Sequence, residues 1–151
     1  VVTAGPGERD LAAAVAAGAG LGPDAVVTTD LAGTAALVAD AALVICGDTG
    51  IGHLATAFGT PSVLLFGPTP PDRWGPPPRA RHRVLWAGTT GDPHADTPDP
   101  GLVRLSVPRV VRTARTLLFG GEPCQHTPVH AARTPRQADS RSGSSAPATS
   151  D

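Results

Sequence analysis

The 151-residue sequence predicts an α/β fold, a Rossmann-like parallel sheet with helices on both faces. Apolar runs alternate along residues 1–66 with stretches of helical periodicity, the order that right-handed crossovers between parallel strands require. The runs Ala41–Cys46 and Ser62–Phe66 lack polar alternation, which is typical of strands covered on both faces. We therefore expect one domain over residues 1–119, a size that one hydrophobic core can support.

The first part of this domain is expected to hold two strands and a helix. Val1–Thr3 predicts a strand, and a Gly-rich turn follows it. The Ala-rich stretch Glu8–Gly18 predicts a helix, with Leu11 and Val15 on one face. Val26–Thr28 predicts the next strand.

Two further helices are expected around the apolar run Ala41–Cys46. Asp30 is a suitable cap for the helix before the run. After it, Gly47–Gly50 predicts a tight turn and Ile51–Phe58 a short helix that ends at Gly59.

The chain changes character after the strand Ser62–Phe66. The Pro-rich stretch Thr69–Pro78 is expected to lack regular structure. Val84–Trp86 predicts a small edge strand, Gly88–Gly101 a polar loop, and Val107–Phe119 the last helix. Residues 120–151 are rich in Ser, Thr, Pro and Arg and have little to bury, so we expect a disordered tail.

The charge balance argues against two classes of partner. There are 12 basic residues, all of them Arg, and 13 acidic ones, which gives a net charge of −1. Such a chain has no overall electrostatic field that would attract nucleic acid or an anionic membrane surface.

The longest apolar run is far shorter than the roughly 20 residues of a transmembrane segment, and no secretory signal is evident. Cys46 and Cys124 lie far apart, which excludes a disulfide framework. We expect a cytoplasmic protein, at most peripheral at the inner face of the membrane.

The sequence begins in a strand-like run and contains no methionine. Natural chains start with Met, and folds seldom begin within a strand. We therefore expect the C-terminal part of a longer protein, or a reading frame with a misplaced start.

The loop after Ala41–Cys46 has the composition of a ligand-binding turn. In open parallel sheets, ligands bind beyond the carboxyl ends of the strands. Gly47 and Gly50 let a ligand approach the backbone, and the amides that start the next helix favour a phosphate or diphosphate. Asp48 is suited to accept hydrogen bonds from sugar hydroxyls, and His53 lies about one turn into the helix. The alternative is a capping Asp and a packed His with no ligand.

The next strand is followed by a second unusual loop, Gly67–Pro76. It is stiff and carries one hydroxyl (Thr69), one cation (Arg73) and one indole (Trp74). Stiffness lowers the entropy lost on binding. Because the loop lies one strand away from the Gly47–Gly50 turn, it is expected to form the other wall of the same cleft. The alternative is a Pro-rich connector with Trp74 packed as a cover.

Three motifs recur in order between residues 46 and 76. They are Asp48-Thr49-Gly50 with His53-Leu54-Ala55 and Ala57; Gly59-Thr60-Pro61 with Val63 and Leu65-Phe66-Gly67-Pro68-Thr69; and Trp74-Gly75-Pro76. Together they resemble glycosyltransferase family 9, the heptosyltransferases of bacterial lipopolysaccharide core assembly and their relatives. The resemblance extends over roughly residues 1–119.

The resemblance implies two Rossmann-like domains, the GT-B architecture, with the active site between them. This chain is similar to the C-terminal half, which binds the nucleotide-sugar donor. By motif, Asp48 contacts donor-sugar hydroxyls, the amides of Thr49 and Gly50 with the Thr49 hydroxyl hold the diphosphate, and His53 stands beside that group. The expected donor-binding set also includes Gly47, Gly5 and Thr69.

The implied reaction is inverting transfer of a heptose-like sugar. The donor resembles ADP-heptose, and the acceptor is a cell-envelope glycan or the lipopolysaccharide core. The donor is a substrate, and no cofactor is expected. No catalytic residue is assigned in this chain, because the family places the base in an N-terminal domain that this sequence lacks. The alternative function is a non-catalytic nucleotide or sugar-phosphate-binding module. A hydrolase is disfavoured because no GxSxG motif occurs.

Histidines outside the Gly-rich turn are expected to have no ligand. His94, with Asp92, Asp96 and Asp99, is the candidate metal cluster, but it lies in a Pro-rich surface loop, so no metal site is expected. His82 lies in an Arg-rich turn and is expected to be solvated.

Overall fold

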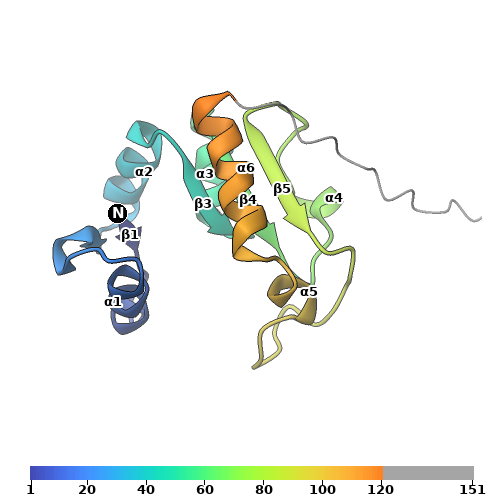
Figure 1. The fold of residues 1–151 in the computed structure, drawn as a ribbon, viewed down its shortest axis with the longest axis horizontal. Coiled ribbons are helices and arrows are strands. Elements are labelled where there is room, and N and C mark those ends of the chain that lie inside the picture. Colours follow the sequence, from blue (N-terminus) through green and yellow to red (C-terminus); the bar gives the residue numbers. More distant parts are fainter. Residues whose placement is uncertain (121–151) are drawn as a thin grey trace, which may run out of the picture.

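The computed structural model describes residues 1–120, which form parallel strands flanked by helices on both faces (Figure 1). The predicted α/β class is thereby confirmed. Each helix within residues 1–120 is too short or too polar to span a bilayer. The predicted tail, 120–151, lies outside the described residues apart from Gly120. The strands are β1 (Val2–Thr3), β2 (Val26–Val27), β3 (Val44–Gly47), β4 (Ser62–Phe66) and β5 (His82–Trp86).

The described strands belong to two sheets. β1 pairs with β2, and β3, β4 and β5 form a second sheet in that order, with every pairing parallel. The register places Ile45 beside Val63 and Leu65 beside Leu85. A continuous sheet is the simplest expectation from the sequence, but no ladder joins β1 or β2 to β3 in residues 1–120.

The helices cover the two sheets from different sides. α1 packs on β1 and β2, and α2 packs on α3. α3 and α6 lie on opposite faces of the β3–β4–β5 sheet (Figure 1). The helices are α1 (Arg9–Gly18), α2 (Leu31–Asp40), α3 (Gly50–Phe58), α4 (Pro71–Trp74), α5 (Pro100–Val103) and α6 (Val107–Phe119), with a 3₁₀ turn at Pro23–Ala25.

The helix ends follow the expected capping chemistry. The Asp30 carboxylate accepts a hydrogen bond from the Gly33 amide at 2.8 Å, as the predicted cap of α2. Gly59 ends α3 with φ of 72°, a left-handed conformation that glycine adopts without a Cβ penalty.

The core of the described chain lies between the larger sheet and α6. Val63, Leu85 and Ala114 are buried there. Half-buried apolar side chains pack around them, namely Leu43, Leu65, Leu105, Val110 and Leu117.

The first helix forms as predicted, but its larger apolar side chains are not its buried ones. Leu11 and Val15 are exposed, and the buried residues of α1 are Ala12 and Ala16. The small alanine side chains let the helix approach the short β1–β2 pair closely, and this leaves the larger side chains at its flanks.

The run Ala41–Cys46 is not covered on both faces as predicted. Its regular part is β3, and the Ile45 side chain is 50 % exposed. The physical reason is that α6 packs on β4 and not on β3, which lies at the edge of this sheet in the described chain. β4 itself is buried along nearly all of its length.

Two segments expected to be irregular contain single helical turns. α4 lies within the Pro-rich stretch because Pro71 occupies its first turn, where the missing amide costs nothing. α5 begins at Pro100 for the same reason, and the Asp99 carboxylate caps it by accepting from the Leu102 amide at 3.0 Å.

His82 is not solvated as predicted but buried at the start of β5, with 6 % of its surface exposed. Its Nδ1 lies 2.9 Å from the Ser62 hydroxyl oxygen. Burial lowers the pKa of His82, and the charges of Arg81 and Arg79 lower it further.

Candidate functional site

The candidate site lies where β3 and β4 end and α3 begins. Gly47 is the last residue of β3, and Phe66 is the last of β4. Both line a small indentation of about 10 Å³ at this edge of the sheet. The carboxyl ends of parallel strands are where ligands bind in open α/β sheets, so the location fits the expectation.

The first turn of α3 supplies hydrogen-bond donors. Thr49 precedes the helix in an extended conformation, with φ of −142° and ψ of 170°, and its side chain makes no capping hydrogen bond. The first amides of any α-helix have no acceptor within the helix. The positive end of the helix dipole therefore points to the indentation, and the Thr49 side chain does not cap it.

Two glycines of this turn have different physical roles. A Cβ on Gly52 would lie 3.1 Å from Leu64 Cδ2, so Gly52 lets α3 pack closely on β4. A Cβ on Gly50 would meet nothing within 4 Å. Gly50 therefore keeps the start of the helix open on its outer side, where a bulky ligand can approach the backbone.

The polar side chains of the motif gather at the same place. Asp48, Thr49 and His53 line the indentation together with Gly47, and all three side chains are on exposed residues. Thr56, one turn after Gly52, also lines it, and its hydroxyl donates to the Gly52 carbonyl at 2.9 Å.

The Pro-rich loop forms the opposite wall, as the sequence predicts. Trp74, which is 61 % exposed, and Pro76 line the indentation from the end of α4. The turn is closed by the Gly75 amide, which donates to the Pro71 carbonyl at 2.7 Å. A Cβ on Gly75 would collide with that carbonyl, so this sharp turn requires glycine.

Three expected site residues, Gly5, Thr69 and Gly50, do not line the indentation. Gly5 lies after β1 in the other sheet, and its amide donates to the Glu8 carboxylate at 3.0 Å. Thr69 follows β4 and is half-buried, but it does not line the indentation. Gly50 lies at the start of α3, beside the lining residues Thr49 and Gly52.

Sequence reasoning missed the residue that anchors the second loop. The Trp86 indole N–H lies 3.1 Å from the Gly67 carbonyl and 3.0 Å from the Thr89 carbonyl, and it donates to both. It therefore ties the exit of β4 to the exit of β5. The signal in the sequence was an amphipathic residue at the end of a strand, which needs a partner for its N–H when half-buried.

The thiol of Cys46 lies next to the site but is not activated. Burial raises the pKa of Cys46 and the nearby Asp48 carboxylate raises it further, against a hydrogen bond with Thr49 that lowers it. A thiol with a raised pKa is a poor nucleophile at neutral pH. Residues 1–120 contain no group of three or more His, Cys, Asp or Glu side chains arranged to hold a metal ion.

Comparison with known proteins identifies the family. The model of glycosyltransferase family 9 (heptosyltransferase) matches residues 2–100. Lipopolysaccharide heptosyltransferase 1 of Pseudomonas aeruginosa is 46 % identical over 65 residues, which are 42 % of this chain and 18 % of that protein. The match thus spans about a fifth of the relative's length. No solved structure matches the chain. Since the family model covers well over half of the sequence, the chain belongs to glycosyltransferase family 9.

Proposed function

We propose that this chain is the donor-binding part of a glycosyltransferase that transfers a heptose-like sugar, with inversion, from an ADP-heptose-like donor. The acceptor is a cell-envelope glycan or the lipopolysaccharide core. The observation that carries the proposal is that a carboxylate and an exposed indole, Asp48 and Trp74, line one indentation beside the open start of α3 at Gly50.

Each group has a task that fits its chemistry. The amides of Thr49 and Gly50 hold the diphosphate at the positive end of α3. Asp48 accepts hydrogen bonds from the sugar hydroxyls, since a carboxylate is an acceptor and a poor phosphate ligand. His53 donates to a phosphate oxygen or a sugar hydroxyl, and the Trp74 ring offers a flat apolar surface to the sugar or base.

The bond changes in the transfer explain why the helix start matters. The acceptor oxygen loses its proton to a base and bonds to the anomeric carbon, while the bond from that carbon to the diphosphate oxygen breaks. The electron pair of the broken bond goes to the diphosphate, whose charge therefore grows in the transition state. The α3 amides stabilise this growing charge. The base belongs to the acceptor-binding domain of the complete enzyme.

Substitution of the carboxylate tests the proposal. In the longest polypeptide that the reading frame encodes, Asp48→Asn is expected to lower the rate of sugar transfer by about 10- to 100-fold, the cost of a lost charged hydrogen bond. Asp24→Asn, at an exposed site in the 3₁₀ turn after α1, is the matched control. The substrates are a panel of nucleotide sugars, with binding followed by calorimetry and transfer by release of the nucleotide.

The outcomes separate the two candidate functions. Transfer that falls with Asp48→Asn but not with Asp24→Asn supports the proposal. Calorimetric binding of a nucleotide sugar without transfer to any glycan acceptor supports the non-catalytic binding module instead. Equal transfer by both variants contradicts the role given to Asp48.

A further inference from the structure

Trp74 is a large apolar side chain that the fold leaves exposed beside the candidate site. It is 61 % exposed, whereas Leu64 and Phe66, which also line the indentation, are 4 % and 1 % exposed. Trp86, the other tryptophan of the sequence, is half-buried and donates its N–H to two carbonyls. Trp86 thus has a structural task, whereas the packing of the described core gives no reason for an indole at position 74.

The Trp74 side chain stands on a rigid turn. Trp74 is the last residue of α4. Within this turn the Arg73 amide donates to the Pro70 carbonyl at 3.2 Å, and the Gly75 amide donates to the Pro71 carbonyl at 2.7 Å. The proline rings fix the backbone further, because each locks its own φ. A rigid platform loses little entropy when a ligand binds against it.

The wall around Trp74 offers few hydrogen-bond donors from its backbone. The amides of Arg73 and Gly75 are used within the turn. Pro71 and Pro76 have no amide N–H. A protein that holds a nucleobase reads the donors and acceptors along the edge of the base by hydrogen bonds, whereas the C–H groups of a sugar ring need no such partners. The wall therefore suits the C–H face of a sugar better than it suits a base.

The size of the indentation brings Asp48 and Trp74 against the same part of a ligand. Both residues line it, and its volume is about 10 Å³. Such a volume has room for roughly one water-sized group, and a sugar hydroxyl is of that size. A hydroxyl that enters toward the Asp48 carboxylate therefore brings the C–H groups of its own ring next to the indole.

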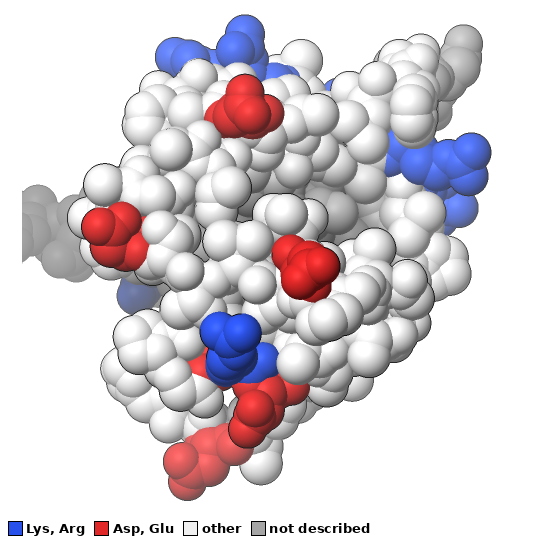
Figure 2. Space-filling view, turned by 90° about the vertical axis from the view of Figure 1, so that its left-hand side faces the viewer, with Lys and Arg blue, Asp and Glu red and all other residues white. Residues whose placement is uncertain are grey.

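The charges near the site keep a diphosphate out of the indentation. Among the described residues that line it, Asp48 is the one acidic residue, and none is Arg. Figure 2, which looks onto the side of the molecule that carries α1 and α2, shows further Asp and Glu side chains scattered over a mostly uncharged surface. Carboxylates repel a diphosphate, so the start of α3 is left for the diphosphate and the indentation for a neutral, hydroxylated group.

We propose that Trp74 stacks on the C–H face of the donor sugar and does not contact the nucleobase. The negative face of the indole ring attracts the weakly positive C–H groups. In a nucleotide sugar the diphosphate separates the sugar from the nucleoside, so a residue that shares the indentation with Asp48 lies on the sugar side. This step rests on the proposed function, in which Asp48 accepts hydrogen bonds from the sugar hydroxyls. Trp74 is thereby a specificity-determining residue for the sugar.

The test compares two ligands that share the base and differ by the sugar. ADP-heptose and ADP are titrated by calorimetry into the polypeptide used for the transfer assay. Trp74→Ala is expected to lower the affinity for ADP-heptose by about fivefold to tenfold, the range of one aromatic contact. It is expected to leave the affinity for ADP unchanged within about twofold. If another nucleotide sugar of the panel binds more tightly, it replaces ADP-heptose, and its own nucleoside diphosphate replaces ADP.

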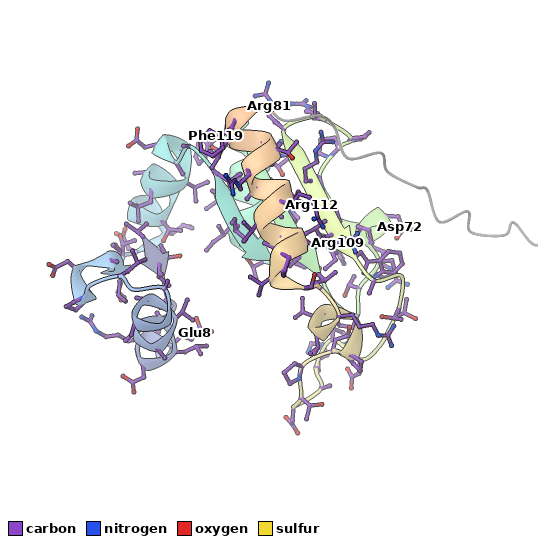
Figure 3. All side chains as sticks on the ribbon, in the orientation of Figure 1. Glu8, Asp72, Arg81, Arg109, Arg112 and Phe119 are labelled. Atoms are coloured by element: carbon purple, nitrogen blue, oxygen red, sulfur yellow. The ribbon has the colours of Figure 1, made fainter. Side chains whose placement is uncertain are left out.

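Further variants separate stacking from a change in the fold. Trp74→Phe keeps an aromatic face and is expected to retain the affinity for ADP-heptose within about threefold, whereas Trp74→Leu is expected to behave like Trp74→Ala. Phe119→Ala is the matched control and is expected to change neither affinity. Phe119 is also exposed, by 77 %, but it lies at the end of α6 on the side toward α2, away from Asp72 of α4 (Figure 3). The Tm of each variant, followed by circular dichroism, shows that it is folded.

Each result of the titrations decides the matter. Loss of affinity for ADP-heptose alone upholds the proposal. Equal loss of affinity for ADP-heptose and ADP places the nucleobase on Trp74 and overturns it, and so does unchanged binding of both ligands by Trp74→Ala and Trp74→Leu. Failure of the unsubstituted protein to bind any nucleotide sugar contradicts the proposed function itself, and this result is seen before any variant is compared.

Discussion

Two glycines in the first turn of α3 differ in what an added methyl group would meet. At Gly52 the methyl is pressed against the buried Leu64, 3.1 Å away, and at Gly50 it meets open space. Gly52→Ala is therefore expected to lower the free energy of unfolding by about 1–2 kcal/mol, the cost of overpacking. Gly50→Ala is expected to preserve it, since alanine favours the helix. Urea titrations of the two variants measure this difference.

The substitution at Gly50 also tests where the diphosphate binds. If the ligand lies against the α3 amides, the Gly50 methyl obstructs it and donor affinity falls by about tenfold, roughly 1.4 kcal/mol. Calorimetry with a nucleotide sugar in the longest encoded polypeptide gives the affinity. A Gly50→Ala variant that binds the donor as well as the unsubstituted protein places the diphosphate elsewhere.

The buried Ser62–His82 pair makes stability depend on pH. The pKa of His82 is lowered below 6.5 in the folded chain, mainly by burial. The unfolded state therefore binds a proton at a higher pH than the folded state does, and stability is present above pH 6.5 and lost as the pH falls toward the lowered folded value. Tm of residues 1–151 is expected to drop between pH 7.5 and 5.5. His82→Asn, which keeps an acceptor for the Ser62 hydroxyl, is expected to remove part of this drop; an equal drop in both proteins assigns the effect to other groups.

At the scale of the elements, the indole of Trp86 holds the connection between β4 and β5 in place. Trp86→Phe removes two hydrogen bonds, to the carbonyls of Gly67 and Thr89, and is expected to cost about 1–2 kcal/mol of stability. Trp74→Phe is the matched substitution, because Trp74 is 61 % exposed and is expected to leave stability unchanged. Chemical denaturation of both variants checks the difference. The idea that Trp86 holds the loop fails if both lose the same amount.

Elements whose ends carry local signals were predictable from the sequence. α6 begins and ends at the predicted residues, Val107 and Phe119, and β4 does so at Ser62 and Phe66. Gly59 marked the end of α3. The exceptions depend on which neighbours are present. β3 has the composition of a doubly covered strand but lies at an edge, and composition does not record whether a partner strand occupies that edge.

The residues of the candidate site that lie close together in the sequence were predictable. Gly47, Asp48, Thr49 and His53 follow one another around a strand end and a helix start, and the structure brings them together. Trp74 was also expected on the opposite wall. The anchoring role of Trp86 was not predictable, because its acceptors are 19 and 3 residues away and their meeting depends on the relative placement of β4 and β5. The assignment of these residues to a donor stays a prediction.

At the scale of the whole molecule, the described part of the chain ends with a helix, α6, that is capped by Gly120. Gly120 adopts the left-handed conformation with φ of 67°, and its amide donates to the Thr116 carbonyl at 3.1 Å, so α6 is capped by a described residue. The sequence of residues 121–151 offers few apolar side chains to bury. Deletion of these residues is therefore expected to leave Tm unchanged within about 1 °C. Differential scanning calorimetry of the longest encoded polypeptide, with and without residues 121–151, measures this. A fall of several degrees would mean that the segment packs on the domain, and the exposed stripe Val107, Val111 and Leu118 of α6 is the surface on which to seek the contact.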